Sequence, residues 1–189
     1  MSRLQYQCTM SLDGFIAGAA GDMSWLTEYA SSAAVQSDTA SDLDSAADLT
    51  DDLVPAIGAV LVGNRTFRGD DPNKGTDSEG AYGGQWSGPT FVLTHHVPAE
   101  PEVDVTFSDD LHGAVAAARA AAGDKIVGVL GADVARQCIE AGLLDELLVS
   151  IAPVLLGDGV RLFDRPGGSP VRLQVLDVSG LTIVLRVVR

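Results

Sequence analysis

Three segments of the sequence have a layout that suits the binding of a phosphate group. Each one is a strand-to-helix corner: a buried apolar strand leads into a short polar or glycine turn and then into the start of a helix. The segments are residues 60–67, 91–96 and 127–134. A helix start offers unpaired backbone N–H groups and a positive dipole end. Gly63, Gly131 and Ala132 would let a ligand approach the backbone closely, although any one corner could equally be only a turn.

Positive charge is scarce in this chain and is notable at the first corner. The 12 Lys and Arg residues face 26 Asp and Glu residues, which gives a formal net charge of −14. Such a charge repels nucleic acid and anionic membranes, so we expect neither as a partner, and a phosphate site must be locally positive. Arg65 and Arg68 therefore stand out. The polar side chains of the first two corners are Asn64, Arg65, Thr66, Thr94, His95 and His96. Neither histidine has partners at metal-ligand spacing, so we predict no metal site.

Two acids and one tryptophan follow the first strand. Asp13 and Glu28 are candidate proton donors, since a positioned carboxyl group can act as a general acid. Asp13-Gly14 is also a common turn pair, in which the carboxylate would hold the loop through backbone hydrogen bonds. Glu28 could instead be a solvated helix residue. Trp25 could line a substrate pocket or anchor the core.

The long polar stretch at residues 69–88 contains many glycines and has two aromatic residues in its second half. Loops of this length are usually functional or mobile. Tyr82, Gln85 and Trp86 could stack on a planar heterocycle and hydrogen-bond to it, as a wall or lid of a substrate pocket. The alternative is a flexible surface loop with one buried aromatic side chain.

Alternating strands and helices must position these residues. Apolar runs and turn residues predict strands at residues 3–9, 57–62, 91–94, 103–107, 125–130, 146–151, 173–178 and 181–188. Helices are predicted at residues 24–29, 41–54, 109–122 and 133–141. We expect Pro55 to end the second helix, Ser108 or Asp109 to cap the third, and residues 16–22 to form a loop.

The order of these elements predicts an α/β fold. It is a three-layer α/β/α sandwich with a mixed, mostly parallel sheet and a C-terminal antiparallel hairpin. In such sheets, ligands bind beyond the carboxyl ends of the parallel strands. A chain of 189 residues suits a single domain, residues 1–189.

Composition favours a cytoplasmic protein. No apolar run approaches the roughly 18 residues of a membrane helix, and the first residues lack the layout of a signal peptide. Cys8 and Cys138 are too few for a disulfide framework, and we predict that both are small core hydrophobes.

Three further stretches are specific enough to indicate a family. They are T-M-S-L-D-G-F-I-A with D-M-S-W-L (residues 9–17 and 22–26), L-V-G-N-R-T-F (residues 61–67) and the long segment at residues 140–163. The first resembles the first strand and substrate loop of the dihydrofolate reductase-like superfamily, and the second resembles its cofactor motif G-R-x-T-[YF]. The third resembles the signature of the RibD C-terminal branch, which contains riboflavin-biosynthesis reductases.

The resemblance implies an NADPH-dependent reductase, with NADH as the alternative cofactor, and a homodimer. It implies a small heterocyclic substrate that is pterin-, pyrimidine- or ribosylaminopyrimidine-like. Thr9, Ile16 and Ala17 would flank the nicotinamide. The adenosine end would be held by Gly63, Asn64, Arg65, Thr66, Thr94 and His95, and the pyrophosphate by Gly131, Ala132, Asp133 and Val134.

Three departures from the family pattern keep other interpretations open. Asn64 stands where the family usually has the arginine that meets the 2′-phosphate, and Leu130-Gly131 replaces a paired glycine. The acid of dihydrofolate reductases aligns near Ala30, with Glu28 out of register. One alternative is a ligand-binding relative without turnover. The other is a structural dimer whose corners are only turns.

Overall fold

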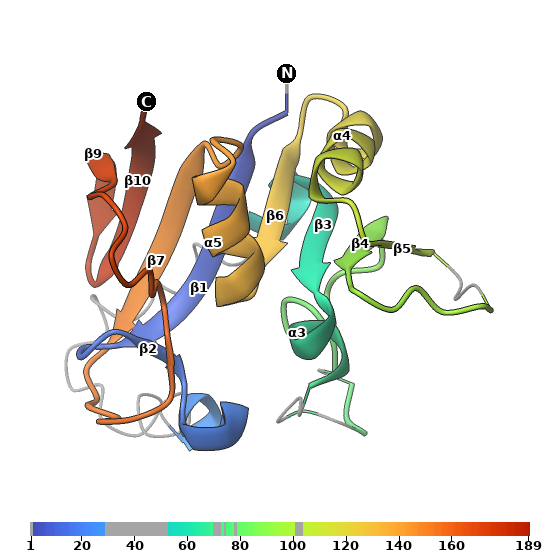
Figure 1. Ribbon diagram of the computed structural model, residues 1–189. Helices are drawn as coiled ribbons and strands as arrows, with labels where there is room; N and C mark the ends of the chain where they lie inside the picture. Colours follow the sequence, from blue (N-terminus) through green and yellow to red (C-terminus); the bar gives the residue numbers. More distant parts are fainter. Residues whose placement is uncertain (1, 29–52, 70–72, 74, 78, 101–103) are drawn as a thin grey trace.

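The computed structural model describes residues 2–28, 53–69, 73, 75–77, 79–100 and 104–189 (Figure 1). An eight-stranded sheet forms its centre, in the order β5-β4-β3-β6-β1-β7-β10-β9. The strands from β5 to β7 pair in parallel, and β10 and β9 are antiparallel to their neighbours. The strands are β1 (Leu4–Ser11), β3 (Ile57–Gly63), β4 (Thr90–Leu93), β5 (Val105–Ser108), β6 (Ile126–Leu130), β7 (Glu146–Ala152), β9 (Arg172–Ser179) and β10 (Thr182–Val188). The predicted fold class is confirmed.

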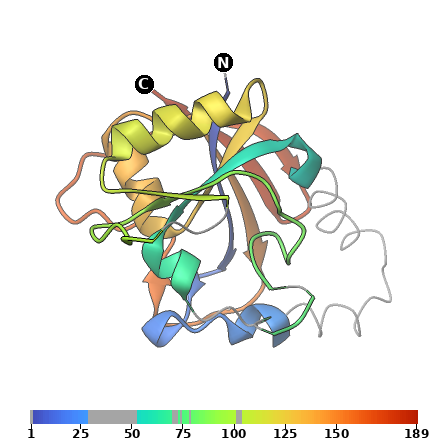
Figure 2. The ribbon, with the colours of Figure 1, turned by 90° about the vertical axis from the view of Figure 1, so that its right-hand side faces the viewer.

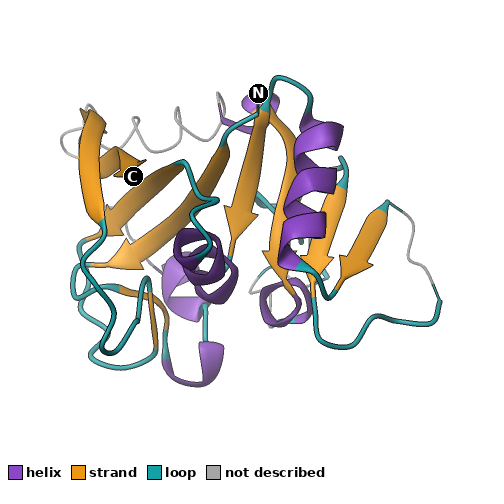
Figure 3. Ribbon diagram, turned by 45° about the horizontal axis from the view of Figure 1, so that its top comes forward, coloured by secondary structure: helices purple, strands orange, loops and turns teal. Residues whose placement is uncertain are grey.

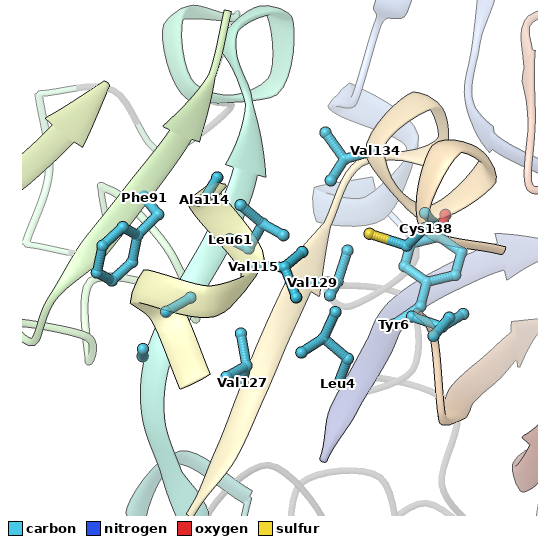
Figure 4. Packing of buried hydrophobic residues seen from close by; sticks show 14 of the residues in the cluster. Leu4, Tyr6, Leu61, Phe91, Ala114, Val115, Val127, Val129, Val134 and Cys138 are labelled. Atoms are coloured by element: carbon cyan, nitrogen blue, oxygen red, sulfur yellow. The ribbon is translucent and has the colours of Figure 1, made fainter. Parts of the chain in front are cut away.

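The two longest described helices, α4 (Leu111–Ala122) and α5 (Ala132–Glu140), cover one face of the sheet (Figure 1). Alternate strand residues point to this face because side chains alternate along a strand. Leu4 of β1 and Val129 of β6 therefore pack against Val115 of α4 and Val134 of α5 (Figure 4). A second apolar cluster, which includes Ile57, Val60, Val62 and Val92, fills the opposite face of β3 and β4.

A second, two-stranded sheet corrects the prediction of a loop at residues 16–22. Strand β2 (Phe15–Ala17) pairs antiparallel with β8 (Val160–Arg161). The partner comes from a distant part of the chain, so the local pattern around Phe15 does not show it. A single turn of 3-10 helix, η1 (Ala19–Gly21), follows β2.

Two helix ends also differ from prediction. The helix predicted at residues 41–54 lies mostly outside the described residues, but residues 53–56 are helical. Pro55 therefore does not end it at residue 54, since the fixed φ of proline is compatible with a helix. Asp110 caps α4, and its carboxylate accepts a hydrogen bond from His112 N at 3.0 Å. The predicted caps, Ser108 and Asp109, therefore lie too early in the sequence, and Ser108 is instead the last residue of β5. None of the described helices is long and apolar enough to cross a membrane.

Candidate functional site

The first and third corners pack against each other at the carboxyl ends of β3 and β6. A Cβ atom built on Gly131 would lie 2.4 Å from Thr66 Oγ1, and one built on Gly63 would lie 3.0 Å from Val134 Cγ2. Strand β3 pairs in parallel with both β4 and β6, so the second corner lies at the same edge. Figure 2 shows that the short helix α3 (Asn64–Arg68) and the segment after β2 also lie at this edge.

The N-terminus of α5 has no side-chain cap. Its N-cap residue, Gly131, has a φ of 94° and makes no side-chain cap hydrogen bond. Asp133 accepts hydrogen bonds from Arg136 Nη2 at 2.6 Å and from Gln137 Nε2 at 2.8 Å. Burial raises the pKa of Asp133, but these bonds outweigh it and lower the pKa overall, and the nearby His95 acts in the same direction. Arg136 thus offsets the negative charge of Asp133, which would otherwise oppose the binding of an anion at this helix N-terminus.

The first corner presents two exposed arginines, and one of them is held in place. Asn64 Oδ1 accepts a hydrogen bond from Arg68 Nε at 3.3 Å. The Arg68 guanidinium lies 5.7 Å from the ring centroid of Phe67 and 5.5 Å from that of Phe107, which places it toward β5. Arg65 is exposed on α3. Asn64 therefore orients Arg68, and Arg65 is the residue of this corner to test first for a phosphate.

The second corner is fixed by a threonine. Thr94 is buried, its N–H donates to Ser108 O at 2.9 Å, and its Oγ1 accepts from His96 N at 3.2 Å. These bonds hold the turn through which His95 and His96 reach solvent. Thr94 therefore shapes the corner from which His95 helps to lower the pKa of Asp133.

Asp13 ties the end of β1 to the loop before β8. Its carboxylate accepts hydrogen bonds from Ser11 Oγ at 2.6 Å, Leu156 N at 3.1 Å and Gly157 N at 2.7 Å. The Ser11 hydroxyl contributes most to lowering the pKa of Asp13 to about 2, against a smaller opposing effect of desolvation, and the two amides add to it. Asp13 is therefore ionised at neutral pH. An ionised carboxylate suits a residue that holds the turn by accepting hydrogen bonds, which was the alternative to a role as proton donor.

The residues expected to flank a nicotinamide lie on β1 and β2, which are in contact. Thr9 and Ile16 are half-buried, and Ala17 is buried. Gly159, just before β8, approaches so closely that a Cβ atom there would lie 2.1 Å from Ala17 O. The loop before β8 thus fixes the position of β2 at the end of β1.

Trp25 and Glu28 lie on the short helix of residues 24–28, which follows η1 at the same edge of the sheet (Figure 1). Trp25 is 7% exposed, and its Nε1 is buried without a hydrogen-bond partner in the described part of the chain. Buried polar groups normally have a partner, so this N–H is a candidate donor to a ligand. Glu28 is exposed.

Tyr82 lies over the face of the sheet opposite α4 and α5. Its hydroxyl donates to Gln7 Oε1, and Gly128 of β6 leaves the space that the hydroxyl occupies. Gln7 Nε2 donates to Gln5 Oε1 at 2.8 Å, and Gln5 Nε2 donates to Glu146 Oε2 at 3.3 Å. A continuous chain of buried polar side chains therefore joins Tyr82 to the start of β7.

Gln85 and Trp86 lie at the opposite end of the strands from the three corners. Trp86 Nε1 donates to Thr90 Oγ1, at the start of β4, at 3.3 Å. Both residues line an open depression of about 660 Å³ with Gly58 and Lys125, which lie at the amino ends of β3 and β6. The structure thus places these two residues away from the carboxyl edge, although Gln85 N still donates a hydrogen bond to Tyr82 O at 3.3 Å.

Sequence reasoning did not single out Gln5, Gln7 and Glu146. A polar residue at every second position of a central strand is unusual, because such strands are normally apolar. The alternation Q-Y-Q at residues 5–7 was the available signal. Among the described residues, no group of three or more His, Cys, Asp or Glu side chains could hold a metal ion.

The mixed, mostly parallel eight-stranded sheet with its C-terminal antiparallel hairpin has the dihydrofolate reductase-like α/β fold. A sequence model of the RibD C-terminal domain matches residues 3–182. The chain belongs to the RibD C-terminal domain family. The comparison with curated proteins finds no match.

Solved structures share the fold at low sequence identity. A candidate riboflavin biosynthesis protein from Shewanella sp. PV-4 is 22% identical, with all of both chains covered and a TM-score of 0.69. A pyrimidine reductase-like protein from Corynebacterium diphtheriae is 17% identical over 100% of this chain and 92% of its own, with a TM-score of 0.61. A Thermotoga maritima diaminohydroxyphosphoribosylaminopyrimidine deaminase/5-amino-6-(5-phosphoribosylamino)uracil reductase is 17% identical, with a TM-score of 0.61. This chain spans 57% of that protein.

Proposed function

We propose that this protein is an NAD(P)H-dependent reductase that transfers hydride to a small pterin-, pyrimidine- or ribosylaminopyrimidine-like heterocycle. The observation that carries the proposal is the uncapped N-terminus of α5, which lies against the Gly63–Thr66 corner at the carboxyl edge of a parallel sheet. Dinucleotide phosphates bind at such edges and helix starts. Membership of the RibD C-terminal domain family supports the same conclusion.

The residues at this edge fit a dinucleotide. The N–H groups that begin α5, at residues 132–134, would hold the pyrophosphate, with Arg136 offsetting the charge of Asp133. Arg65 and His95 would bind the adenosine end and favour NADPH over NADH through the 2′-phosphate. Thr9, Ile16 and Ala17 would form the wall against the nicotinamide.

The chain would act mainly by orientation. A bound nicotinamide cofactor supplies the hydride. The protein would align the heterocycle with it, and the buried N–H of Trp25 would donate a hydrogen bond to that heterocycle. Asp13 would stay ionised and hold β1 to the loop before β8, so a proton for the product would come from Glu28 or from water. We further propose that the protein works as a cytoplasmic homodimer.

Titration with NADPH and NADH tests the cofactor site. Ligand binding to the folded state should raise the melting temperature. Trp86→Phe leaves Trp25 as the only tryptophan, at the carboxyl edge, and its fluorescence should change on binding. Trp25→Phe is the matched control, because Trp86 lies at the other end of the sheet. The absence of any melting shift, or a fluorescence change confined to Trp86, would refute the site.

Arg65→Ala tests the preference for NADPH. A hydrogen bond to a charged group contributes about 1.5–3 kcal/mol, so the variant should bind NADPH roughly 10- to 100-fold more weakly and leave NADH binding unchanged. Arg119→Ala is not a suitable control because Arg119 bonds Asp145; exposed Arg172→Ala is suitable. An equal loss for both nucleotides would exclude Arg65 from the 2′-phosphate.

Loss of NADPH absorbance with 5-amino-6-(5-phosphoribosylamino)uracil or a related heterocycle as acceptor tests turnover. Reduction of one such compound supports the reductase. Tight nucleotide binding without reduction of any heterocycle would instead favour a ligand-binding relative.

A further inference from the structure

The chain contains two Asp-Gly pairs, and each directly precedes one strand of the small two-stranded sheet. Asp13-Gly14 comes before β2, and Asp158-Gly159 comes before β8. Figure 3 draws this region mostly as loop (teal), at the periphery of the molecule. An aspartate before a glycine is open to attack by the next backbone nitrogen, because glycine has no side chain to shield that nitrogen. The contacts of each pair therefore decide which of the two is reactive.

Asp158 holds its carboxyl group beside the nitrogen of Gly159. Asp158 is exposed, and its Oδ1 accepts a hydrogen bond from Gly159 N at 2.8 Å. Within the described part of the chain, neither the carboxylate nor that nitrogen has another hydrogen-bond partner. The nitrogen thus lies next to the carbon that it would attack, and the exposed carboxyl group is free to turn toward it.

Asp13-Gly14 has the same two residues, but both reacting groups are held elsewhere. Three hydrogen bonds hold the carboxylate of Asp13. Gly14 N donates to Ser11 O at 2.9 Å and is thereby directed away from that carboxylate. The carboxyl group must also be protonated before its oxygen can leave as water. The Ser11 hydroxyl, with a smaller contribution from two amides, lowers the pKa of Asp13 to about 2, so this group stays ionised. The fold therefore protects Asp13 from the attack to which Asp158 is open.

We propose that Asp158-Gly159 is a site of spontaneous isomerisation, at which aspartate becomes isoaspartate. Gly159 N forms a bond to Asp158 Cγ and gives up its proton, and the carboxyl OH leaves with that proton as water. The product is a five-membered cyclic imide. Water then adds to the imide at one of its two carbonyl carbons. Opening at Cγ restores aspartate, whereas opening at the main-chain carbon leaves a backbone that runs through Cγ. That backbone is one methylene longer, and the main-chain carboxylate is free.

The extra methylene falls between two anchored residues. Gly157 N donates to the carboxylate of Asp13, and Gly159 lies so close to β2 that a side chain there would overlap Ala17 O. A backbone that is longer between these two points displaces either the loop from Asp13 or β8 from β2. The isomerisation is independent of the reductase function, but its effect on a nicotinamide beside Ala17 rests on that proposed function.

Ageing of the folded full-length protein in mildly acidic buffer, below its melting temperature, tests the site. Trypsin places the two Asp-Gly pairs on different peptides, residues 4–65 and 137–161. Isoaspartate should form at Asp158 at least about tenfold faster than at Asp13, because Asp13 must first break its hydrogen bonds. In concentrated urea, where the fold holds neither pair, the two rates should be similar. Chromatography separates the isomeric peptides, which have the same mass, and electron-transfer fragmentation assigns the altered residue.

Asp158→Glu is the matched control, because it keeps the charge but would have to close a less favourable six-membered ring. It should form no product at this position. Asp158→Asn should react faster than wild type at neutral pH, with release of ammonia, because an amide does not have to be protonated first. The aged wild-type protein should melt at a lower temperature than the fresh protein, and aged Asp158→Glu should not.

Absence of isoaspartate at Asp158 in the folded protein, or equal amounts at Asp13 and Asp158, would overturn the proposal. An unchanged melting temperature of the isomerised protein would contradict the displacement of β2 or of the loop. NADPH binding is measured separately on the fresh and aged samples. A wrong cofactor site shows as no binding by the fresh protein and leaves the isoaspartate result unaffected.

Discussion

Gly131 and Thr66 approach so closely that no side chain fits between them: a Cβ atom on Gly131 would lie 2.4 Å from Thr66 Oγ1. Gly131 also has a φ of 94°, a conformation that other residues rarely adopt. The residue that precedes α5 is thereby restricted both by its own backbone and by α3. This contact and the close approach of Gly63 to Val134 together set the spacing of the first and third corners.

We expect Gly131→Ala to lower the free energy of unfolding by about 2–5 kcal/mol, because the strained backbone and the steric overlap both add to the loss. Urea unfolding measures it. Gly142→Ala is the matched control at the other end of α5, since Gly142 has a φ of 67° but no atom within 4 Å of its Cβ position. The control should lose only about 1–2 kcal/mol. Equal losses at the two positions would show that the contact with Thr66 contributes nothing.

Tyr82→Phe is expected to destabilise the protein by about 1–3 kcal/mol, because it leaves the buried side-chain oxygen of Gln7, Oε1, without the hydroxyl that donates to it. Gln7→Leu alone removes both bonds that Gln7 makes. The two single variants and the double variant form a thermodynamic cycle, and we expect a coupling energy of about 0.5–3 kcal/mol between the two side chains. If the losses of unfolding free energy in the two single variants simply add up in the double variant, a direct interaction between the two side chains is contradicted.

Asp13→Asn should change how stability depends on pH. The pKa of Asp13 is lowered to about 2 in the folded protein, below the ordinary value of about 3.9. Its contribution is therefore present above about pH 4 and is lost as the pH falls toward 2. The melting temperatures of wild type and variant should differ most at neutral pH and converge in acid. Asp109→Asn, at an exposed position, serves as the control, and a pH-independent difference at Asp13 would contradict the assignment.

Both cysteines should be unreactive in the native protein. Burial raises the pKa of Cys8 to about 12, against a smaller lowering effect of Tyr6, and burial raises that of Cys138 to about 12 as well. The thiolate is the reactive form, so labelling with a disulfide reagent at pH 8 should be at least about a hundredfold slower in the folded than in the unfolded protein. Rapid labelling of one thiol under native conditions would show that this site is open.

Much of the fold was predictable because the strands carry their own apolar signal. The run at residues 57–62, bounded by Pro55 and Gly63, is buried on both faces and is part of β3. The turn at Ser179-Gly180 joins the predicted terminal hairpin. Where burial alone determines whether a segment forms a strand, the local pattern of apolar residues is sufficient to predict that strand.

Parts of the candidate site depend on partners that are remote in sequence. Nothing near Asp13 indicates that the amides of Leu156 and Gly157 will meet its carboxylate. Trp86 and Tyr82 are close neighbours in sequence, yet one lies at the amino end of the strands and the other over the middle of β1 and β6. Both pack against the same apolar cluster, and only the tertiary structure gives their polar atoms different partners, Gln7 for Tyr82 and Thr90 for Trp86.

The two edge strands of the sheet differ in length, and so in how readily each could pair with a strand from another chain. Strand β9 has eight residues, whereas β5, at the other edge, has four. A long exposed edge strand is a template for unwanted pairing, and a short one is a poor template. Conditions that drive this protein to aggregate would therefore recruit the C-terminal hairpin before the β5 edge.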